Sequence, residues 1–373
     1  MRSDSPGIVV GVLGAGQLGR MLALAGYPLG MRFRFADESP AASAAMLAQF
    51  SLCRFDDVGS LENFTHGLHV VTYEFENVPV SLAAALAREV AVYPPPRALE
   101  VSQDRLIEKC FFNGMGIPTP AFLPVNSRDE LADSVRQLSM PAVLKTRQMG
   151  YDGKGQFIIN TLDDADAAWD AVGRKPLILE EQIAFSAEVS QISVRDTQGN
   201  VAHYPLVQNQ HRDGLLRYSA PLTGDEWPGI GQIRSQAQDY ARRVLTELDY
   251  VGVLAIEFFV AGDRLLANEM APRVHNSGHW TIEGAETSQF ENHLRAICGL
   301  PLGSTALNGH SAMLNIIGRL PHVPSVLAEN GVHLHLYDKE PRAGRKLGHI
   351  TVRAGTPERR DDLARRIFDL LPQ

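Results

Sequence analysis

The first hundred residues alternate between strand-like and helix-like segments, and this alternation constrains the fold more than any other feature. Strand-like segments cover 7–14, 31–37, 69–75 and 89–94, and helix-like segments cover 17–30 and 81–89. Strands that alternate with helices form a parallel sheet with helices on both faces. The sequence therefore predicts a Rossmann-like α/β domain over 1–104, with the proline-rich break at 93–98 as a linker.

The rest of the chain has a different pattern, which predicts α+β structure. A helix begins near 99 and ends by 118, and strands at 141–146, 156–160 and 176–183 with a helix at 162–173 predict a small lobe over 113–183. Longer strands on either side of a helix at 231–248 predict a larger, mostly antiparallel sheet over 184–300. Short strands at 331–339 and 346–355 and a final helix predict a small β-rich C-terminal domain over 301–373. A chain of 373 residues is expected to form two or three domains.

Composition narrows the class of protein. The formal net charge of −8 argues against binding nucleic acid through phosphate contacts. Three scattered cysteines, Cys53, Cys110 and Cys298, fit a reducing cytosol and are predicted to be small buried apolar residues. The N-terminal residues lack the apolar run of a signal peptide, and no apolar stretch approaches the roughly 20 residues of a membrane span. A cytoplasmic protein without a membrane partner is therefore expected.

The segment "GAGQLG" follows the first strand and opens the first helix, with Gly14, Gly16 and Gly19 at the spacing of a dinucleotide-binding turn. Asp37 ends the next strand, where such turns carry an acidic residue. Glycines let the backbone approach a phosphate, and the helix N-terminus supplies N–H donors. The same turn serves NAD(P), another nucleotide or sugar phosphate, or only the close packing of a helix on a sheet.

The loop "GYDGKGQ" at 150–156 is not a Walker A loop, because Gly155 and not Ser or Thr follows Lys154. Lys145 lies five residues before this loop, at the end of an apolar strand. A strand lysine beside a glycine-rich flap that carries a second lysine can enclose a polyphosphate. The alternative is a hairpin turn with a solvated lysine.

Two glutamates lie in a strand–turn–strand segment at 252–271. With a three-residue turn, position 257 pairs with 267, so that Glu257 and Glu269 lie diagonally on one face of the sheet. Two such carboxylates repel and raise one pKa, and Mg²⁺ relieves the repulsion and bridges phosphates. A two-residue turn would place one glutamate on a solvated face.

A polar segment, "APRVHNSGHW" at 271–280, follows Glu269 closely. Arg273, His275, Asn276 and Ser277 are predicted to form an anion-binding cluster beside the metal. His275 and His279 have a spacing that occurs in zinc sites, but neither a helix nor a third ligand is evident.

Together these features resemble the ATP-grasp superfamily and, more narrowly, its 5-(carboxyamino)imidazole ribonucleotide synthase family of purine biosynthesis. The segments that carry the resemblance follow the family's order along most of the chain: "GAGQLGRM", "TYEFENV", "QDRLIEK", "GIPTP", "LKTRQMGYDGKGQ", "EEQIAFSAEVS", "NQHRDG", "IEFF", "NEMAPRVHNSGHWT" and "KLGHITV". The resemblance implies an ATP-grasp fold over 105–300 behind the N-terminal domain.

The resemblance also implies a site for ATP and Mg²⁺, with Mn²⁺ as a possible substitute. The residues implied to contact ATP are Arg105, Lys145, Gly150, Tyr151, Asp152, Gly153, Lys154, Gly155, Gln156, Glu180, Glu181, Gln182, Ile183, Glu188, His211, Asn268 and Glu269. Glu257 and Glu269 would hold the metal. Ala271 occupies the position of a third metal ligand in many ATP-grasp enzymes, so the resemblance implies two protein ligands.

The implied reaction joins ATP, bicarbonate and 5-aminoimidazole ribonucleotide through carboxyphosphate. Residues implied to act in catalysis are Tyr151, Asp152, Arg273, His275, Asn276 and Lys346. Residues implied to bind the ribonucleotide or bicarbonate are Gly16, Gln17, Leu18, Glu76, Arg273, Asn276, Lys346 and Arg353. The family is typically homodimeric.

Three other functions compete with this one. Another ATP-grasp ligase, such as a formate-dependent glycinamide ribonucleotide transformylase or a biotin carboxylase, would share the fold but not the substrates. A dehydrogenase would use the turn at 14–19 for NAD(P) and leave the paired glutamates unexplained. A nucleotide-sensing module would bind ATP without turnover.

Overall fold

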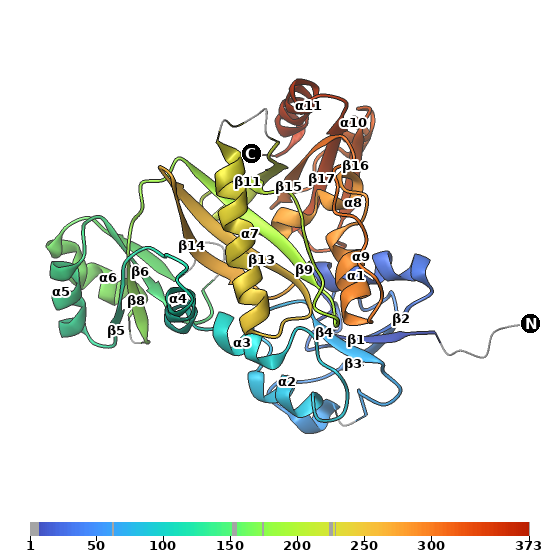
Figure 1. Cartoon of the computed structure of the whole chain (residues 1–373), viewed down its shortest axis with the longest axis horizontal. Helices are drawn as coiled ribbons and strands as arrows, with labels where there is room; N and C mark the ends of the chain where they lie inside the picture. Colours follow the sequence, from blue (N-terminus) through green and yellow to red (C-terminus); the bar gives the residue numbers. More distant parts are fainter. Residues whose placement is uncertain are drawn as a thin grey trace, which may run out of the picture.

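The computed structural model describes residues 7–61, 63–150, 155–173, 175–223, 227 and 229–372. Within these residues the strands form three sheets. Figure 1 shows the smallest helix–sheet unit standing out at one side of the molecule, with the N-terminal and C-terminal elements gathered at the other end. The predicted loop residues Tyr151, Asp152, Gly153 and Lys154 lie outside the described residues.

The N-terminal sheet is parallel, as the alternating pattern predicts. Its strands are ordered β3-β2-β1-β4, and every neighbouring pair runs parallel. The elements are β1 Val9–Leu13, α1 Gln17–Gly26, β2 Arg32–Asp37, β3 Gln49–Leu52, β4 Val70–Tyr73, α2 Val80–Leu86 and α3 Pro96–Ser102. The strand predicted at 89–94 is wrong, because only Val92 pairs there, in a single bridge with Val71. The proline-rich break is partly helical, since α3 begins at Pro96.

A small four-stranded sheet follows, in the order β5-β8-β6-β7. Its elements are α4 Arg105–Gly114, β5 Phe122–Val125, α5 Arg128–Gln137, β6 Ala142–Thr146, β7 Gln156–Ile159, α6 Ala165–Val172 and β8 Leu177–Glu181. The single helix predicted from 99 is two helices, α3 and α4. The Asp104 side chain caps α4 by accepting hydrogen bonds from the amides of Leu106 and Ile107, which a continuous helix would not allow.

The third sheet has nine strands and is antiparallel throughout its pairs. Its strands are β9 Ala187–Arg195, β10 Val201–His203, β11 Val207–Arg212, β12 Leu215–Pro221, β13 Gly252–Ala261, β14 Arg264–Ala271, β15 His310–Ile317, β16 Val332–Leu336 and β17 Lys346–Ala354. Its helices are α7 Ile230–Glu247, α8 Thr281–Gly284, α9 Gln289–Ile297, α10 Val323–Leu327 and α11 Pro357–Leu370. Because β12 pairs with β15, the sheet continues across the boundary expected at 300/301.

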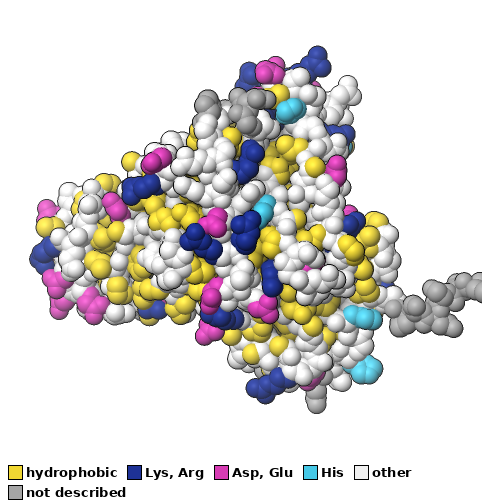
Figure 2. All heavy atoms as spheres, viewed as in Figure 1, with side chains coloured by type: hydrophobic (Ala, Val, Ile, Leu, Met, Phe, Trp, Pro, Cys, Tyr) yellow, Lys and Arg dark blue, Asp and Glu magenta, His cyan; other side chains and the backbone are white. Residues whose placement is uncertain are grey.

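Three further observations concern the surface and the cysteines. Cys53 is buried and Cys298 is half-buried, but Cys110 is exposed on α4, so its predicted burial is wrong. On the face drawn in Figure 2, Lys and Arg side chains are interspersed with Asp and Glu. None of the described helices is both long enough and apolar enough to span a membrane.

Candidate active site

Two cavities meet at the centre of the molecule. The larger, about 1070 Å³, lies among the N-terminal domain, the large sheet and the loop before β17. The smaller, about 340 Å³, lies between the small sheet and the large one. The residues that line both cavities are Arg105, Glu257, Glu269, His275, Asn276 and Lys346. The two volumes therefore share one charged wall, across which two ligands would face each other.

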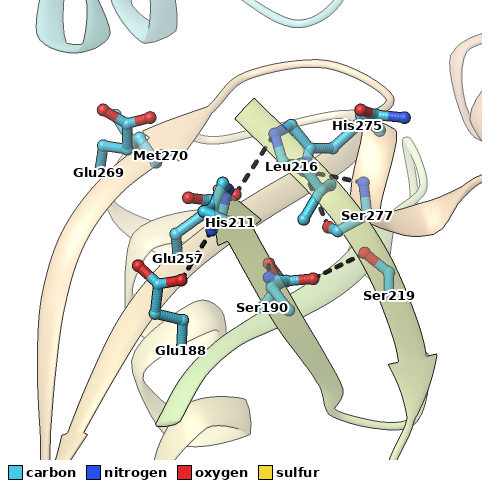
Figure 3. Close-up of polar contacts among 12 residues, drawn as sticks. Glu188, Ser190, His211, Leu216, Ser219, Glu257, Glu269, Met270, His275 and Ser277 are labelled. Carbon is cyan, nitrogen blue, oxygen red and sulfur yellow. Dashed lines mark hydrogen bonds and ion pairs between the residues drawn. The ribbon is translucent and has the colours of Figure 1, made fainter. Parts of the chain in front are cut away.

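The paired glutamates lie on this wall, in a register that differs from the predicted one. The turn between β13 and β14 has two residues, because Ala261 pairs with Arg264. A bulge then leaves Asn268 unpaired, so that Glu257 lies directly opposite Glu269. The predicted three-residue turn and the pairing of 257 with 267 are wrong. The bulge, and not the turn length, brings both carboxylates to one face (Figure 3).

The pKa values of the two carboxyl groups shift in opposite directions because their surroundings differ. Burial, and next the charge of Glu269, raise the pKa of Glu257 to about 7. Burial also acts to raise the pKa of Glu269, but Arg105, whose Nη1 lies 2.8 Å from its Oε2, outweighs burial and lowers it. His275 Nε2 lies 3.6 Å from Glu257 Oε1, and Figure 3 shows this contact beside the pair. Mutual repulsion of this kind favours a bound cation.

The chemistry of these side chains fits a hard divalent cation. Carboxylate and amide oxygens are suitable ligands, and Asn268 Oδ1 is a buried acceptor without a hydrogen-bond partner among the described residues. Asn268 and both glutamates line the smaller cavity. The side chain of Ala271, the position where the resemblance implies a third ligand in many ATP-grasp enzymes, offers no donor atom. In the described part of the chain, no group of three or more His, Cys, Asp or Glu side chains is placed to hold a metal.

The smaller cavity also contains most of the residues that the sequence assigned to ATP. These are Arg105, Lys145, Gln156, Glu180, Glu181, Gln182, Ile183, Glu188, His211, Asn268 and Glu269. His211 Nδ1 lies 2.7 Å from Glu188 Oε2 (Figure 3), and although burial lowers the pKa of His211, this hydrogen bond raises it above its usual value. Gly150 lines the larger cavity instead, and Gly155 directly precedes β7, where its carbonyl accepts from the amide of Thr146 at 2.8 Å.

At the base of the smaller cavity, the side chain of Glu180 pairs with two lysines. Its Oε2 lies 2.9 Å from Lys145 Nζ and 3.2 Å from Lys109 Nζ. Burial acts to raise the pKa of Glu180, but the two ammonium groups lower it to about 2. The sequence predicted a contact of Glu180 with ATP but not its pairing with Lys109, although Lys109 ends the segment "QDRLIEK" that carries the resemblance.

In the larger cavity, Arg273 and Glu76 form a partly buried ion pair, with Arg273 Nε 2.5 Å from Glu76 Oε2. Burial acts to raise the pKa of Glu76, but the charge and hydrogen bond of Arg273 lower it to about 2. Burial, followed by the charges of Arg273 and Lys346, lowers the pKa of His275 to about 3, so its imidazole is neutral at pH 7. The Asn276 amide exchanges two hydrogen bonds with that of Asn315, at 3.0 and 2.8 Å.

The turn at 14–19 is filled by a side chain of the protein. Glu74, two positions before Glu76, accepts hydrogen bonds from the amides of Gly16 and of Gly19, the latter at 2.7 Å. A Cβ at Gly14, where φ is +94°, would lie 2.5 Å from Glu74 Cγ, so this position requires glycine. The amides that the sequence assigned to a phosphate are therefore bound to a carboxylate. This removes the structural basis for NAD(P) binding at the turn.

Of the other residues predicted to bind the ribonucleotide, some line the larger cavity and one lies outside it. Gln17 and Leu18 line it, and Gln17 contacts Lys339. Arg353 does not line either cavity: it is exposed near the end of β17, and its Nη1 donates to the carbonyl of Glu283 at 3.3 Å. It lies seven positions along the strand from Lys346, which at about 3.3 Å per residue is too far to share a ligand.

A cluster of cations was missed by sequence reasoning. Lys339, Arg342, Arg345 and Lys346 all line the larger cavity. Burial, which outweighs the neighbouring charge of Glu74, lowers the pKa of Lys339 to about 8. The signal was available, since four cations fall within "KEPRAGRK", but only Lys346 was singled out. Together they form a positive wall suited to a phosphate ester.

Glu108 is a carboxyl group that the sequence did not assign to the site. It is buried on α4, lines the larger cavity and accepts a hydrogen bond from the amide of Met270 at 2.7 Å. Burial, and next the charge of Glu269, raise the pKa of Glu108 to about 8. The folded state therefore binds a proton that the unfolded state releases near pH 4.5, and stability decreases as the pH rises from about 4.5 to about 8.

Glu108→Gln is therefore expected to stabilise the protein at high pH, because the amide keeps an acceptor for Met270 but carries no charge. At pH 9, in EDTA, the free energy of unfolding in urea should rise by roughly 2–4 kcal/mol over the unsubstituted protein, and at pH 4 the two should agree. Glu100→Gln, an exposed site on α3, is the control and should not change the pH dependence. Equal stabilities at pH 9 would show that folding does not raise the pKa of Glu108.

Comparison with known proteins places these cavities in a family. Three family models match consecutive parts of the chain: a ribonucleotide synthetase preATP-grasp domain over 8–103, an ATP-grasp domain over 110–290 and a phosphoribosylaminoimidazole carboxylase C-terminal domain over 311–362. Their order is that of the three parts expected from the sequence.

Curated relatives match over nearly the whole chain. An N5-carboxyaminoimidazole ribonucleotide synthase of Pseudomonas aeruginosa is 50% identical over 92% of this chain and 94% of its own length. Its counterpart in Brucella melitensis is 45% identical, over 94% of this chain and 97% of its own.

Solved structures agree with these relatives. An N5-carboxyaminoimidazole ribonucleotide synthetase of Thermus thermophilus superposes with a TM-score of 0.92 at 52% identity, covering 98% of this chain and 99% of that one. An N5-carboxyaminoimidazole synthase of Aspergillus clavatus in complex with ADP and 5-aminoimidazole ribonucleotide superposes with a TM-score of 0.88 at 32% identity, over 98% of both chains. With its fold, its two joined cavities and relatives of this identity over more than nine-tenths of its length, the chain belongs to the N5-carboxyaminoimidazole ribonucleotide synthase family of ATP-grasp ligases.

Proposed function

We propose that the protein carboxylates the exocyclic amine of 5-aminoimidazole ribonucleotide, using ATP and bicarbonate, and yields 5-(carboxyamino)imidazole ribonucleotide, ADP and phosphate. The observation that carries the proposal is the wall shared by the two cavities. A nucleotide in the smaller cavity and a second substrate in the larger would meet across Arg105, Glu269 and His275. The Aspergillus clavatus relative was solved with both ADP and the ribonucleotide, which supports this assignment.

In this proposal ATP occupies the smaller cavity. The segment 180–183 contacts the adenine, the bonded pair Glu188 and His211 contacts the ribose, and Lys145 and Arg105 contact the phosphates. Phosphoryl transfer depends mainly on charge neutralisation and alignment, which fixed cations supply. Glu257, Glu269 and the amide oxygen of Asn268 would hold Mg²⁺, or Mn²⁺. When bound, this cation neutralises charge on the transferred phosphoryl group.

Bicarbonate would lie at Arg273, His275 and Asn276, beside the ion pair of Arg273 and Glu76. A bicarbonate oxygen attacks the γ-phosphorus, the bond from phosphorus to the bridging oxygen breaks, and ADP leaves. The resulting carboxyphosphate releases phosphate and CO₂, and the amine attacks this carbon and loses a proton. The site must exclude water while carboxyphosphate exists. Tyr151 and Asp152, outside the described residues, remain proposed contacts of the amine.

The phosphate of the ribonucleotide would bind the cation cluster of the larger cavity. Arg342→Gln is therefore expected to raise the KM for the ribonucleotide about 10–100-fold, because one charged hydrogen bond to phosphate is lost. The KM for ATP should change less than about threefold, since Arg342 does not line the smaller cavity. Arg353→Gln, at the far end of β17, is the matched control and should leave both KM values unchanged. A raised KM for the ribonucleotide in Arg353→Gln, with an unchanged KM in Arg342→Gln, would instead place the phosphate site at Arg353.

Release of ADP in the presence of ATP, bicarbonate and 5-aminoimidazole ribonucleotide tests the function itself. Omission of any one of the three should abolish formation of the N-carboxylated product. Turnover with formate in place of bicarbonate would favour a transformylase, and ATP binding without any turnover would favour a sensing module. The same resemblance supports a homodimer and a cytoplasmic location as proposals, and sedimentation velocity at micromolar concentration tests the first.

A further inference from the structure

Lys109 is a buried charge that the proposed reaction does not use. Its side chain is fully buried on α4, and it does not line either cavity. Figure 1 places α4 where the small sheet meets the rest of the molecule. An isolated ammonium group is costly to bury, so its presence there needs a partner and a reason.

Its partners come from two different sheets. Lys109 Nζ lies 3.2 Å from Glu180 Oε2 on β8 of the small sheet, and it donates to the carbonyl of Asn268 on β14 of the large sheet, also at 3.2 Å. Asn268 precedes Glu269, one of the two proposed metal ligands. Lys109 therefore ties together the two surfaces between which the smaller cavity lies.

Glu180 has more positive partners than its single charge requires. The same oxygen, Oε2, receives Lys109 and Lys145, while Oε1 is buried without a hydrogen-bond partner among the described residues. The two lysines differ in access. Lys145 is 15% exposed and lines the smaller cavity, whereas Lys109 is 0% exposed and cannot reach it.

Because of this difference, Lys145 is able to move to a ligand in the smaller cavity, whereas Lys109 has to stay beside Glu180. Without Lys109, movement of Lys145 to a ligand would leave the buried carboxylate of Glu180 with no lysine paired to it, at a cost that would oppose the movement. With Lys109 in place, Glu180 keeps a cation whichever partner Lys145 takes. Lys145 can then donate to a phosphate without uncovering a buried charge.

We propose that Lys109 is a positioning residue for ATP: it remains the permanent counter-ion of Glu180, so that Lys145 can transfer from Glu180 to the phosphates of ATP. This inference rests on the proposed function, because it requires ATP in the smaller cavity. It assigns Lys109 no direct contact with any substrate.

The test compares single and double substitutions in steady-state kinetics with the full-length protein. Lys109→Met should raise the KM for ATP about tenfold, the size expected when a charged hydrogen bond is lost, because Lys145 is then the only lysine paired with Glu180. The kcat at saturating ATP should fall less than about threefold. Glu180 itself belongs to the proposed ATP site, so the second comparison is made within the Glu180→Gln background. There, adding Lys109→Met should change the KM for ATP less than about threefold relative to Glu180→Gln alone, because no buried carboxylate then competes for Lys145.

This comparison of two backgrounds distinguishes positioning from structural support. A merely structural Lys109 predicts that Lys109→Met raises the KM for ATP as much in the Glu180→Gln background as in the unsubstituted protein, and that result would overturn the proposal. An unchanged KM in Lys109→Met alone would overturn it as well. Should that variant fail to fold, the double variant compared with Glu180→Gln decides by the same threefold limit, since replacing both partners of a buried pair is often tolerated.

Two controls isolate the inference from the function on which it rests. Lys175→Met removes an exposed lysine and should leave the kinetics unchanged. Lys145→Met should raise the KM for ATP whether or not Lys109 has the proposed role. If Lys145→Met has no effect, the proposed ATP site fails; if it has an effect and Lys109→Met has none, only the role of Lys109 fails.

Discussion

Glu269→Gln is expected to lower kcat/KM for ATP-dependent ADP formation by about two to three orders of magnitude, while the fold stays intact. Glu269 accepts from Arg105, lies opposite Glu257 and lines both cavities. The amide has the same shape and keeps the β13–β14 pairing, so the loss would come from charge. Arg105 would lose its anion, and the proposed Mg²⁺ site would lose a carboxylate.

The measurement is ADP release at increasing Mg²⁺ concentration. The variant should need more Mg²⁺ for half-maximal rate, and its far-ultraviolet circular dichroism should match that of the unsubstituted protein. Asp263→Asn is the matched control: it changes a carboxylate to an amide in the turn of the same hairpin, where the side chain is exposed. It should behave as the unsubstituted protein does.

A second readout follows from the pKa of Glu257, which burial and the charge of Glu269 raise to about 7. In Glu269→Gln the repulsive neighbour is neutral, so the pKa of Glu257 should fall toward its usual range. Any decrease in rate at low pH that reflects protonation of Glu257 should therefore occur at lower pH in the variant. Near-normal turnover with an unchanged Mg²⁺ dependence would contradict the metal role of Glu269.

Arg273→Met is expected to have the largest effect on stability, about 3 kcal/mol lost from the free energy of unfolding at pH 7. Arg273 is the cation that pairs with Glu76, and their side chains are 15% and 30% exposed. Removing one partner of a largely buried pair leaves the other charge uncompensated. Adding Glu76→Gln should restore most of the stability, because no unpaired charge then remains, but should not restore carboxylation.

The pH dependence provides an independent check. Arg273 lowers the pKa of Glu76 from 4.5 to about 2 in the folded protein, so this pair stabilises the fold fully above about pH 4.5 and progressively less as the pH falls toward 2. The stability difference between Arg273→Met and the unsubstituted protein should therefore shrink over this range in urea titrations.

Arg97→Met is the control for this second prediction. Arg97 pairs with Glu247 at 3.0 Å, but both side chains are about half exposed, at 54% and 50%. A surface pair of this kind contributes at most about 1 kcal/mol. An equal loss of stability in Arg97→Met and Arg273→Met would show that burial of the Arg273 pair has no special effect.

Local patterns in the sequence predicted much of the secondary structure. The periodicity of apolar residues identified β1, β2, β4, β6, β8, β9 and β13 and helices such as α1 and α7 near their observed ends. Strands β3, β5, β12 and β15 were missed. The segment of β3, "QFSL", has an exposed or half-buried side chain at each position, so burial leaves no pattern to read. Two of these missed strands, β12 and β15, pair with each other. The large sheet therefore continues from the expected ATP-grasp domain into the expected C-terminal domain.

The sequence pointed to many residues that line the two cavities, but not to which of them pair with one another. Motif order pointed to Lys145, Glu188, His211, Glu257, Glu269 and Arg273 as members of a site, and all of them line one or both cavities. Sequence could not reveal that Glu74 fills the turn at 14–19, because that contact spans 58 positions of chain. The sequence also did not reveal the bulge at Asn268. Without this bulge, the two-residue turn would have placed Glu257 and Glu269 on opposite faces of the sheet.

By itself the sequence determined the family, the parallel N-terminal sheet and the residue types of the site, because these depend on short motifs and on the period of side-chain burial. Only the tertiary structure decided which charges meet. Lys109, Lys145 and Glu180 come from one helix and two strands, and Arg273 reaches Glu76 across 197 positions. Local sequence preferences specify the helices and strands. The free energy of burying a charged side chain depends on its partners, which distant helices and strands supply only when they pack together.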